Sequence, residues 1–175
     1  MHLMCEEFVK GTTQVVHPEV AKVGPSLLML KSQGAKTEAV WLLNKNWESV
    51  ENQDDAWIKA IIDVHYINEG VLYLKDYKSG QMYDDHKEQL ELYGLIGMSK
   101  FPEVKRVEHS ALYLDMNYEG HQGSIIRPMV NTMVKVWDTN ARNMMEDEVF
   151  EPKPGNQCRW CPYSKVNNNG VCLHG

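Results

Sequence analysis

The first residues of the chain have hydrophobic side chains at helical spacing. Residues 2–10 carry apolar side chains on one face of a helical pattern and predict a helix that ends at Gly11. Residues 18–30 predict a second helix, interrupted at Pro25. Because no capping residue precedes the first helix, we expect the chain to lack a segment that relatives have ahead of it.

From Thr37 the pattern changes to one typical of β-strands. Strands are predicted over residues 39–43, 57–67, 71–78, 104–116 and 123–127. The turn Asn68-Glu69-Gly70 joins the second of these strands to the third, so the two are predicted to form a hairpin.

Two further helices are predicted, over residues 84–97 and over residues 128–148, the latter with Pro128 in its first turn. The order of elements predicts an α/β domain with a central mixed β-sheet flanked by helices. We expect residues 1–151 to form the core. Residues 152–175, rich in Pro, Gly and Asn and containing three cysteines, are expected to form a tail packed on that core, so that the chain is a single domain overall.

Composition and charge restrict the class of protein. Of the 175 residues, 43% are hydrophobic and 24% charged, which excludes a disordered or collagen-like chain. The 18 basic and 24 acidic residues give a net charge of −6, which argues against coating nucleic acid by bulk charge. No apolar run approaches the roughly 20 residues that cross a bilayer. Glu6 and Glu7 lie where a signal peptide would be apolar, so we expect a cytoplasmic protein.

Two aspartates and a lysine stand on the predicted hairpin. Asp63 lies in its first strand, and Asp76 and Lys78 lie in its second. Because side chains alternate along a strand, Asp76 and Lys78 point the same way, and the hairpin can bring Asp63 beside them. Spacing alone leaves open a surface ion pair of Asp76 with Lys78, which would contribute little.

Carboxylates that meet in this way repel each other unless a cation lies between them. Oxygen ligands that leave water positions open suit Mg²⁺ or Mn²⁺, which can act on a phosphate and activate a bound water. Lys78 would orient or deprotonate that water, or stabilise charge in the transition state. The arrangement predicts hydrolysis of a phosphodiester bond.

Three motifs follow one another along the middle of the chain. They are Ile62-Asp63, Asp76-Tyr77-Lys78-Ser79-Gly80 and Gln89-Leu90-Glu91-Leu92-Tyr93. Their order and spacing resemble the PD-(D/E)XK nuclease superfamily, in particular its RecB-type branch, which includes CRISPR-associated exonucleases and many phage exonucleases. The resemblance implies a restriction-endonuclease-like core.

A histidine near the start extends the resemblance to nearly the whole chain. The RecB-type branch carries a histidine on a helix ahead of the sheet, followed by a glutamate, and His2 with Glu6 or Glu7 is similar to that pair. The alternative for His2 is a frayed chain end that binds nothing.

The resemblance also implies roles for the residues of the site. The implied metal ligands are His2, Asp63, Asp76 and the backbone carbonyl of Tyr77. Lys78 is implied as the catalytic lysine, and Gln89 and Tyr93, at i and i+4 of a helix, as residues that contact DNA or orient Lys78. The alternatives are a core position for Tyr93 and a solvated one for Gln89. Glu38 is either an extra acid at the site or, as we expect, a surface residue.

Cys158, Cys161 and Cys172 crowd the last 18 residues, which in a reducing compartment favours metal binding over disulfides. They are similar to the iron–sulfur site of the RecB-type branch, although the last gap is longer and no cysteine precedes His2. Cys5 would then be the fourth ligand. Zn²⁺ held by the three cysteines with Cys5 or His174 is an alternative, and free thiols in a loose tail are another.

Taken together, the residues and the resemblance predict a Mg²⁺- or Mn²⁺-dependent deoxyribonuclease, an exonuclease that hydrolyses phosphodiester bonds at DNA ends. The resemblance to phage enzymes implies a part in phage or bacterial DNA recombination, replication or degradation. The alternatives are a nuclease-like DNA-binding module with weak or no catalysis and an assembly module of a larger complex. Single-stranded and double-stranded DNA both stay open as partners.

Overall fold

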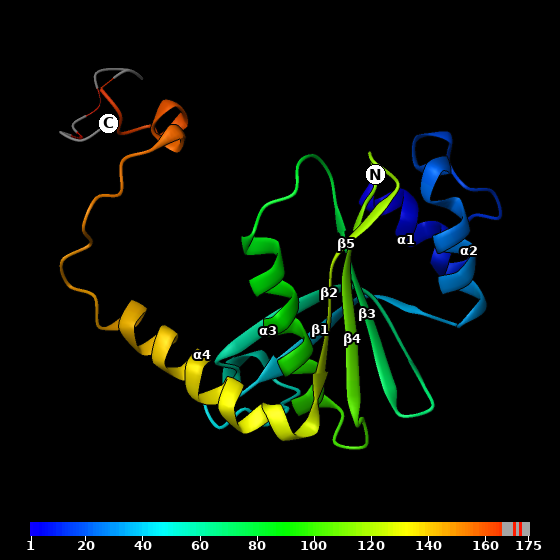
Figure 1. Ribbon diagram of the computed structural model, residues 1–175, viewed down its shortest axis with the longest axis horizontal. Coiled ribbons are helices and arrows are strands. Elements are labelled where there is room, and N and C mark those ends of the chain that lie inside the picture. Colours follow the sequence, from blue (N-terminus) through cyan, green and yellow to red (C-terminus); the bar gives the residue numbers. More distant parts are fainter. Residues whose placement is uncertain (166–169, 171, 173–175) are drawn as a thin grey trace. The chain divides into compact units, whose positions relative to one another are not determined.

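The computed structural model of the protein describes residues 1–165, 170 and 172 (Figure 1). In chain order, its helices and strands are α1 His2–Lys10, η1 Pro18–Val23, α2 Gly24–Ser32, β1 Lys36–Leu43, η2 Gln53–Asp55, β2 Ile58–Asn68, β3 Val71–Lys78, α3 Asp85–Lys100, β4 Arg106–Tyr113, β5 Tyr118–Ile126, η3 Arg127–Met129, α4 Val130–Met145 and η4 Asn156–Trp160. The chain divides into two compact units, Met1–Val136 and Trp137–Gly175, and the whole sheet lies in the first.

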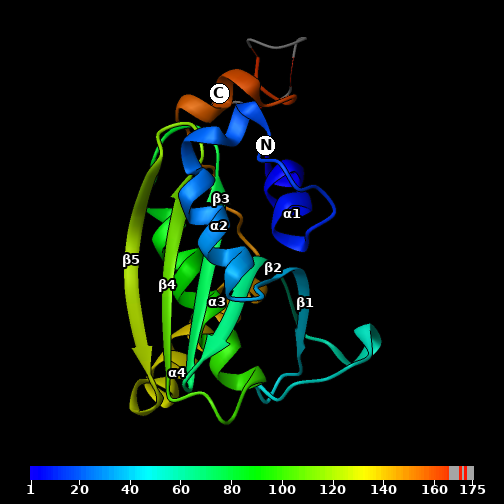
Figure 2. The same ribbon diagram turned by 90° about the vertical axis from the view of Figure 1, so that its right-hand side faces the viewer.

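The sheet has five strands in the order β1-β2-β3-β4-β5. Neighbouring strands are antiparallel except β3 and β4, which are parallel and are connected through α3. Helices α1 and α2 lie on one face of the sheet and α3 on the other (Figures 1 and 2). This confirms the predicted α/β class with a mixed sheet flanked by helices.

Several predicted boundaries differ from the observed ones. The helix predicted over residues 18–30 is divided into η1 and α2, which meet at Val23 and Gly24. Pro25 lies in the first turn of α2, where its missing N–H has no helical partner to lose. The strand predicted over residues 104–116 is shorter, and the one predicted over residues 123–127 is longer, since β5 pairs with β4 from Tyr118 onward. Backbone pairing, which local pattern does not reveal, sets both ends.

The predicted hairpin of β2 and β3 is confirmed. Asn68 pairs with Val71, so the loop consists of Glu69 and Gly70 alone. Their φ angles are 49° and 76°, and a two-residue hairpin loop with positive φ at both positions follows the twist of its strands. Gly70 adopts such an angle without a steric cost.

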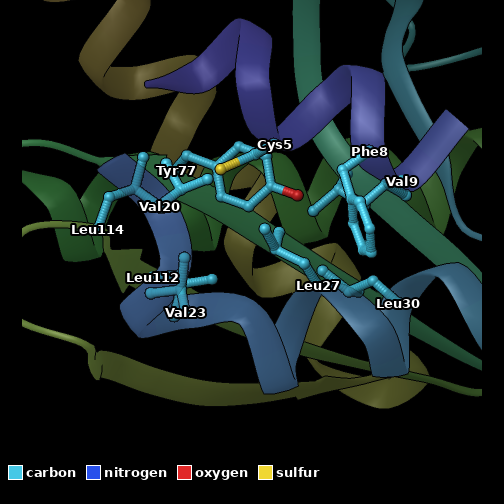
Figure 3. Packing of buried hydrophobic residues seen from close by; sticks show 11 residues of the cluster. Cys5, Phe8, Val9, Val20, Val23, Leu27, Leu30, Tyr77, Leu112 and Leu114 are labelled. Atoms are coloured by element: carbon cyan, nitrogen blue, oxygen red, sulfur yellow. The ribbon is translucent and has the colours of Figure 1, made fainter. Parts of the chain in front are cut away.

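The face of the sheet under α1 and α2 is packed with apolar side chains (Figure 3). Phe8 from α1 and Leu27 from α2 are almost fully buried against Tyr77 of β3. Cys5 lies in the same cluster and has no exposed surface. This packing fixes α1, and with it His2, beside β3.

Helix α3 lies unusually close to the opposite face. A Cβ atom built on Gly97 would meet Leu72 Cδ2 at 2.5 Å and Trp41 at 3.3 Å, so only glycine allows this approach. The C-terminal end of α3 is held by Arg127, whose guanidinium donates to the carbonyl oxygens of Met98 (2.7 Å) and Phe101 (2.9 Å). The helix that carries two of the predicted site residues is therefore anchored at its C-terminal end.

Within the part of the chain that the structure describes, no helix has the length and apolar character needed to traverse a membrane.

Two buried histidines make the stability of the fold depend on pH. His65 and His109 are each 4% exposed, and burial lowers the pKa of each to about 4. The unfolded chain, with an imidazole pKa near 6.5, binds more protons than the native state between about pH 4 and 6.5. The free energy of unfolding should therefore fall as the pH decreases through this window.

The contribution of one histidine can be isolated by substitution. Going from pH 7 to pH 5, His109→Gln should lose about 2 kcal/mol less of its free energy of unfolding than the parent protein loses. Asp63, whose pKa is raised to about 6, acts in the opposite direction in both proteins and cancels in the comparison. Urea denaturation at the two pH values measures the difference. His17→Gln, at an exposed histidine, is the control, and equal losses in the His109 variant and the parent would contradict the prediction.

Candidate active site

The candidate site lies where strands β2 and β3 separate. The pairing of these strands runs from Asn68 and Val71 to Val64 and Lys75 and ends there. Asp63 and Asp76 are the next residues outward, so they face each other where the ladder stops. Both aspartates therefore lie at the same position of the sheet.

Asp63 binds the backbone of the neighbouring strand through its carboxylate. Its Oδ2 accepts a hydrogen bond from the Tyr77 N–H at 2.6 Å, in place of the next rung of the ladder. Burial and then the negative charge of Asp76 raise the pKa of Asp63 to about 6, while the Tyr77 N–H and His2 lower it in part. The two carboxylates are therefore close enough to repel each other.

Asp76 and Lys78 form a shielded ion pair on β3. Lys78 Nζ lies 2.8 Å from Asp76 Oδ2, and their side chains are 18% and 6% exposed. The contact has the distance of an ion pair, but among the described residues no donor has hydrogen-bond geometry toward Asp76 Oδ2. The Lys78 ammonium therefore balances the charge of this oxygen, which keeps the capacity to accept a further partner.

Gln89 and Tyr93 of α3 connect Lys78 to this helix through hydrogen bonds. Lys78 Nζ donates to Gln89 Oε1 at 2.6 Å, and Gln89 Nε2 donates to the Tyr93 hydroxyl at 2.8 Å. Burial raises the pKa of Tyr93, so its hydroxyl remains protonated. The four side chains from Asp76 to Tyr93 form one continuous chain of contacts.

His2 lies at the edge of the same site. Its Nδ1 is 3.7 Å from Asp63 Oδ2, and its ring packs edge-on against Tyr77 at 5.9 Å between centroids. The imidazole is 46% exposed. The structure thus brings together His2, Asp63, Asp76, Tyr77, Lys78, Gln89 and Tyr93.

Glu38 lies nearer to the site than we expected. It is exposed, as predicted, but the β1 residues on its two sides pair with Ile62 and Val64, which places Glu38 opposite Asp63. Its φ of 49° breaks the regular strand there, and its charge contributes to the raised pKa of Asp63. Only the register of β1 against β2, and no local motif, identifies this position.

The residues present suit a divalent cation. Asp63 and Asp76 offer carboxylate oxygens, the ligands that Mg²⁺ and Mn²⁺ prefer. Bringing them together raises a pKa and leaves a buried oxygen without a hydrogen bond, and a cation would relieve both. Among the described residues, no group of three or more His, Cys, Asp or Glu side chains is gathered as a metal site.

The cysteines fall in both units of the chain. Cys5 is fully buried in the first unit, and burial raises the pKa of its thiol to about 11. Cys158, Cys161 and Cys172 belong to the second unit and are partly buried. Their assignment as metal or iron–sulfur ligands stays a prediction, and His174 lies outside the described residues.

In the comparison with known proteins, one family matches the chain. The PD-(D/E)XK nuclease superfamily matches residues 4–166 of the chain. No curated protein matches it. One similar solved structure, described as "Crystal structure of SSO0001", is 15% identical, with a TM-score of 0.43 over 99% of this chain and 81% of that chain.

Proposed function

Because the chain belongs to the PD-(D/E)XK nuclease superfamily, we propose that it is a Mg²⁺- or Mn²⁺-dependent deoxyribonuclease of the RecB-type branch that hydrolyses phosphodiester bonds at DNA ends. The observation that carries the proposal is the contact of Asp76 with Lys78 next to Asp63, where the sheet opens between β2 and β3. The same resemblance suggests a part in phage or bacterial DNA recombination, replication or degradation.

Asp63 and Asp76, together with the backbone carbonyl of Tyr77 and with His2, would hold the divalent ion. When bound, that ion supplies a Lewis acid for the phosphate oxygens and lowers the pKa of a coordinated water. Burial of both carboxylates keeps their charge poorly screened by solvent, which strengthens their attraction for a cation.

Lys78 would act on the scissile phosphate and on the attacking water. In hydrolysis, the water oxygen forms a bond to phosphorus, the bond from phosphorus to the ester oxygen breaks, and that oxygen leaves with a proton. The ammonium of Lys78, held by Asp76 and Gln89, can donate a hydrogen bond to the phosphate as negative charge accumulates. Gln89 and Tyr93 act as positioning residues, since they fix the Nζ atom.

An end-labelled DNA assay tests this proposal. The parent protein should shorten a labelled linear duplex or single strand progressively with Mg²⁺ or Mn²⁺, and EDTA should reduce the rate by at least about a thousandfold. A covalently closed circle is the control for end dependence. Loss of the circle at the same rate would indicate internal cutting and reject the exonuclease assignment. No cleavage of any substrate would favour a DNA-binding or assembly module.

For the tail, we propose a metal or iron–sulfur site built from Cys158, Cys161 and Cys172. Visible absorbance of protein purified without oxygen would indicate an iron–sulfur cluster, and bound zinc in a colourless sample would indicate a structural zinc site. A colourless, metal-free and folded sample would reject both.

A further inference from the structure

A histidine on α3 stands on the same side of the helix as two residues of the proposed site. His86 precedes Gln89 by three positions and Tyr93 by seven, a spacing that places all three on one helical face. Gln89 contacts Lys78, so this face of α3 is turned toward the site. Lys78 pairs with Tyr113 across strands β3 and β4, and the Tyr113 hydroxyl contacts the His86 ring, so the imidazole lies on the same side of the site as the lysine.

Tyr113 of β4 orients the His86 ring. Tyr113 is the strand partner of Lys78 and has no exposed surface. Its hydroxyl lies 2.7 Å from His86 Nδ1 and makes no other hydrogen bond within the described residues. Burial and then the charge of Asp76 raise the pKa of Tyr113, so the hydroxyl keeps its proton. With Tyr113 as donor, His86 Nδ1 is the acceptor and Nε2 carries the ring proton.

The Nε2 atom of His86 is left available to a ligand. Within the described residues it has no hydrogen-bond partner, and the side chain is only partly buried. His121 of β5 lies with its ring centroid 6.0 Å away, and the exposed Tyr83 lies 5.5 Å away. A donor nitrogen on a ring that is oriented by a buried tyrosine, itself the strand partner of Lys78, suits a phosphate anion.

We propose that His86 binds the DNA backbone next to the scissile phosphate, with Nε2 donating to a phosphodiester oxygen and Tyr113 orienting the ring. The inference rests on the proposed nuclease function and deepens it. It assigns this chain a substrate-contacting residue on the side of the site formed by α3, β4 and β5, beyond the residues of the sequence motifs.

Two substitutions separate contact with substrate from a structural role. Glutamine places an amide nitrogen near the position of Nε2, whereas asparagine places one near Nδ1. If Nε2 binds phosphate, His86→Asn should raise KM for DNA about tenfold with little change in kcat, and His86→Gln should stay within about threefold of the parent. If His86 only supports Tyr113, the order of the two variants reverses.

A binding measurement keeps the test independent of activity. In the Asp76→Asn background without added metal, the Kd for a fluorescein-labelled oligonucleotide should rise about tenfold on adding His86→Asn and less than threefold on adding His86→Gln. His17→Gln is the control, because His17 is an exposed histidine that directly precedes η1. Equal Kd values for all variants, equal losses in both His86 variants, or the reversed order would overturn the inference.

The outcomes also separate the inference from the proposed function. A parent protein that does not cleave DNA rejects the proposed function, whereas the ratio of Kd values still decides whether His86 contacts the backbone. A parent that cleaves with unaltered KM in His86→Asn leaves the nuclease assignment intact and overturns the inference alone.

Discussion

Asp76→Asn is expected to lower the rate of metal-dependent DNA cleavage by at least about a thousandfold, which corresponds to about 4 kcal/mol of transition-state stabilisation. Asparagine keeps the volume of the side chain and removes its charge. The affinity for Mn²⁺ should fall as well, because Asp76 supplies a buried oxygen without a hydrogen bond and half of the carboxylate pair. Cleavage by gel assay and Mn²⁺ titration by calorimetry measure the two effects.

The fold should survive this substitution. In the metal-free protein Asp76 repels Asp63 and pairs with Lys78. Removing its charge relieves the repulsion but loses the ion pair, so the free energy of unfolding should change little. Glu108→Gln is a matched control, since Glu108 lies on the same sheet and pairs with Arg106. Cleavage by Asp76→Asn at the parent rate would refute the assignment of the site.

Lys78→Met should lower the cleavage rate by about a hundredfold to a thousandfold while Mn²⁺ still binds. Lys78 donates charge and a hydrogen bond and offers no ligand atom to a metal. Its removal also takes away the cation beside Asp76, so affinity for Mn²⁺ should stay equal or increase. This opposite response of metal affinity distinguishes the lysine from the aspartate.

Lys87→Met controls for the loss of a positive charge elsewhere on α3. Lys87 is an exposed residue of α3 that pairs with Glu91, and its substitution should change cleavage by less than about threefold. Lys78→Arg should remain impaired, because the larger planar guanidinium does not fit the space between Asp76 and Gln89. Full activity of either Lys78 variant would contradict the proposed role of Lys78 in catalysis.

The candidate site illustrates how far local motifs reach. Asp76 and Lys78 could be placed on one face of a strand because strand side chains alternate, and Gln89 and Tyr93 on one face of a helix because four residues make about one turn. The contacts joining these two pairs depend on how closely α3 approaches the sheet. Gly97 permits that approach, and its importance is visible only once Leu72 and Trp41 lie against it.

Other features depended on strand register. Glu38 and Tyr113 lie far from the motifs in sequence. The pairs on either side of Glu38 place it opposite Asp63, and Tyr113 pairs with Lys78. His86 had a local signal, its helical spacing from Gln89, but a histidine at that spacing is equally common on a solvated face. The contact of its Nδ1 with the Tyr113 hydroxyl distinguishes His86 from such a histidine, because it orients the ring.

The sequence by itself determined the order and class of the elements, the hairpin turn and the residues proposed for the centre of the site, because these follow from short-range periodicity and from motifs within a few residues. The tertiary structure alone decided where β2 and β3 separate and which aspartate oxygen is buried without a hydrogen bond. It also decided which residues of distant strands border the site. These depend on pairing and packing between segments far apart in the chain, where the free energy of each contact is set by neighbours that no local pattern specifies.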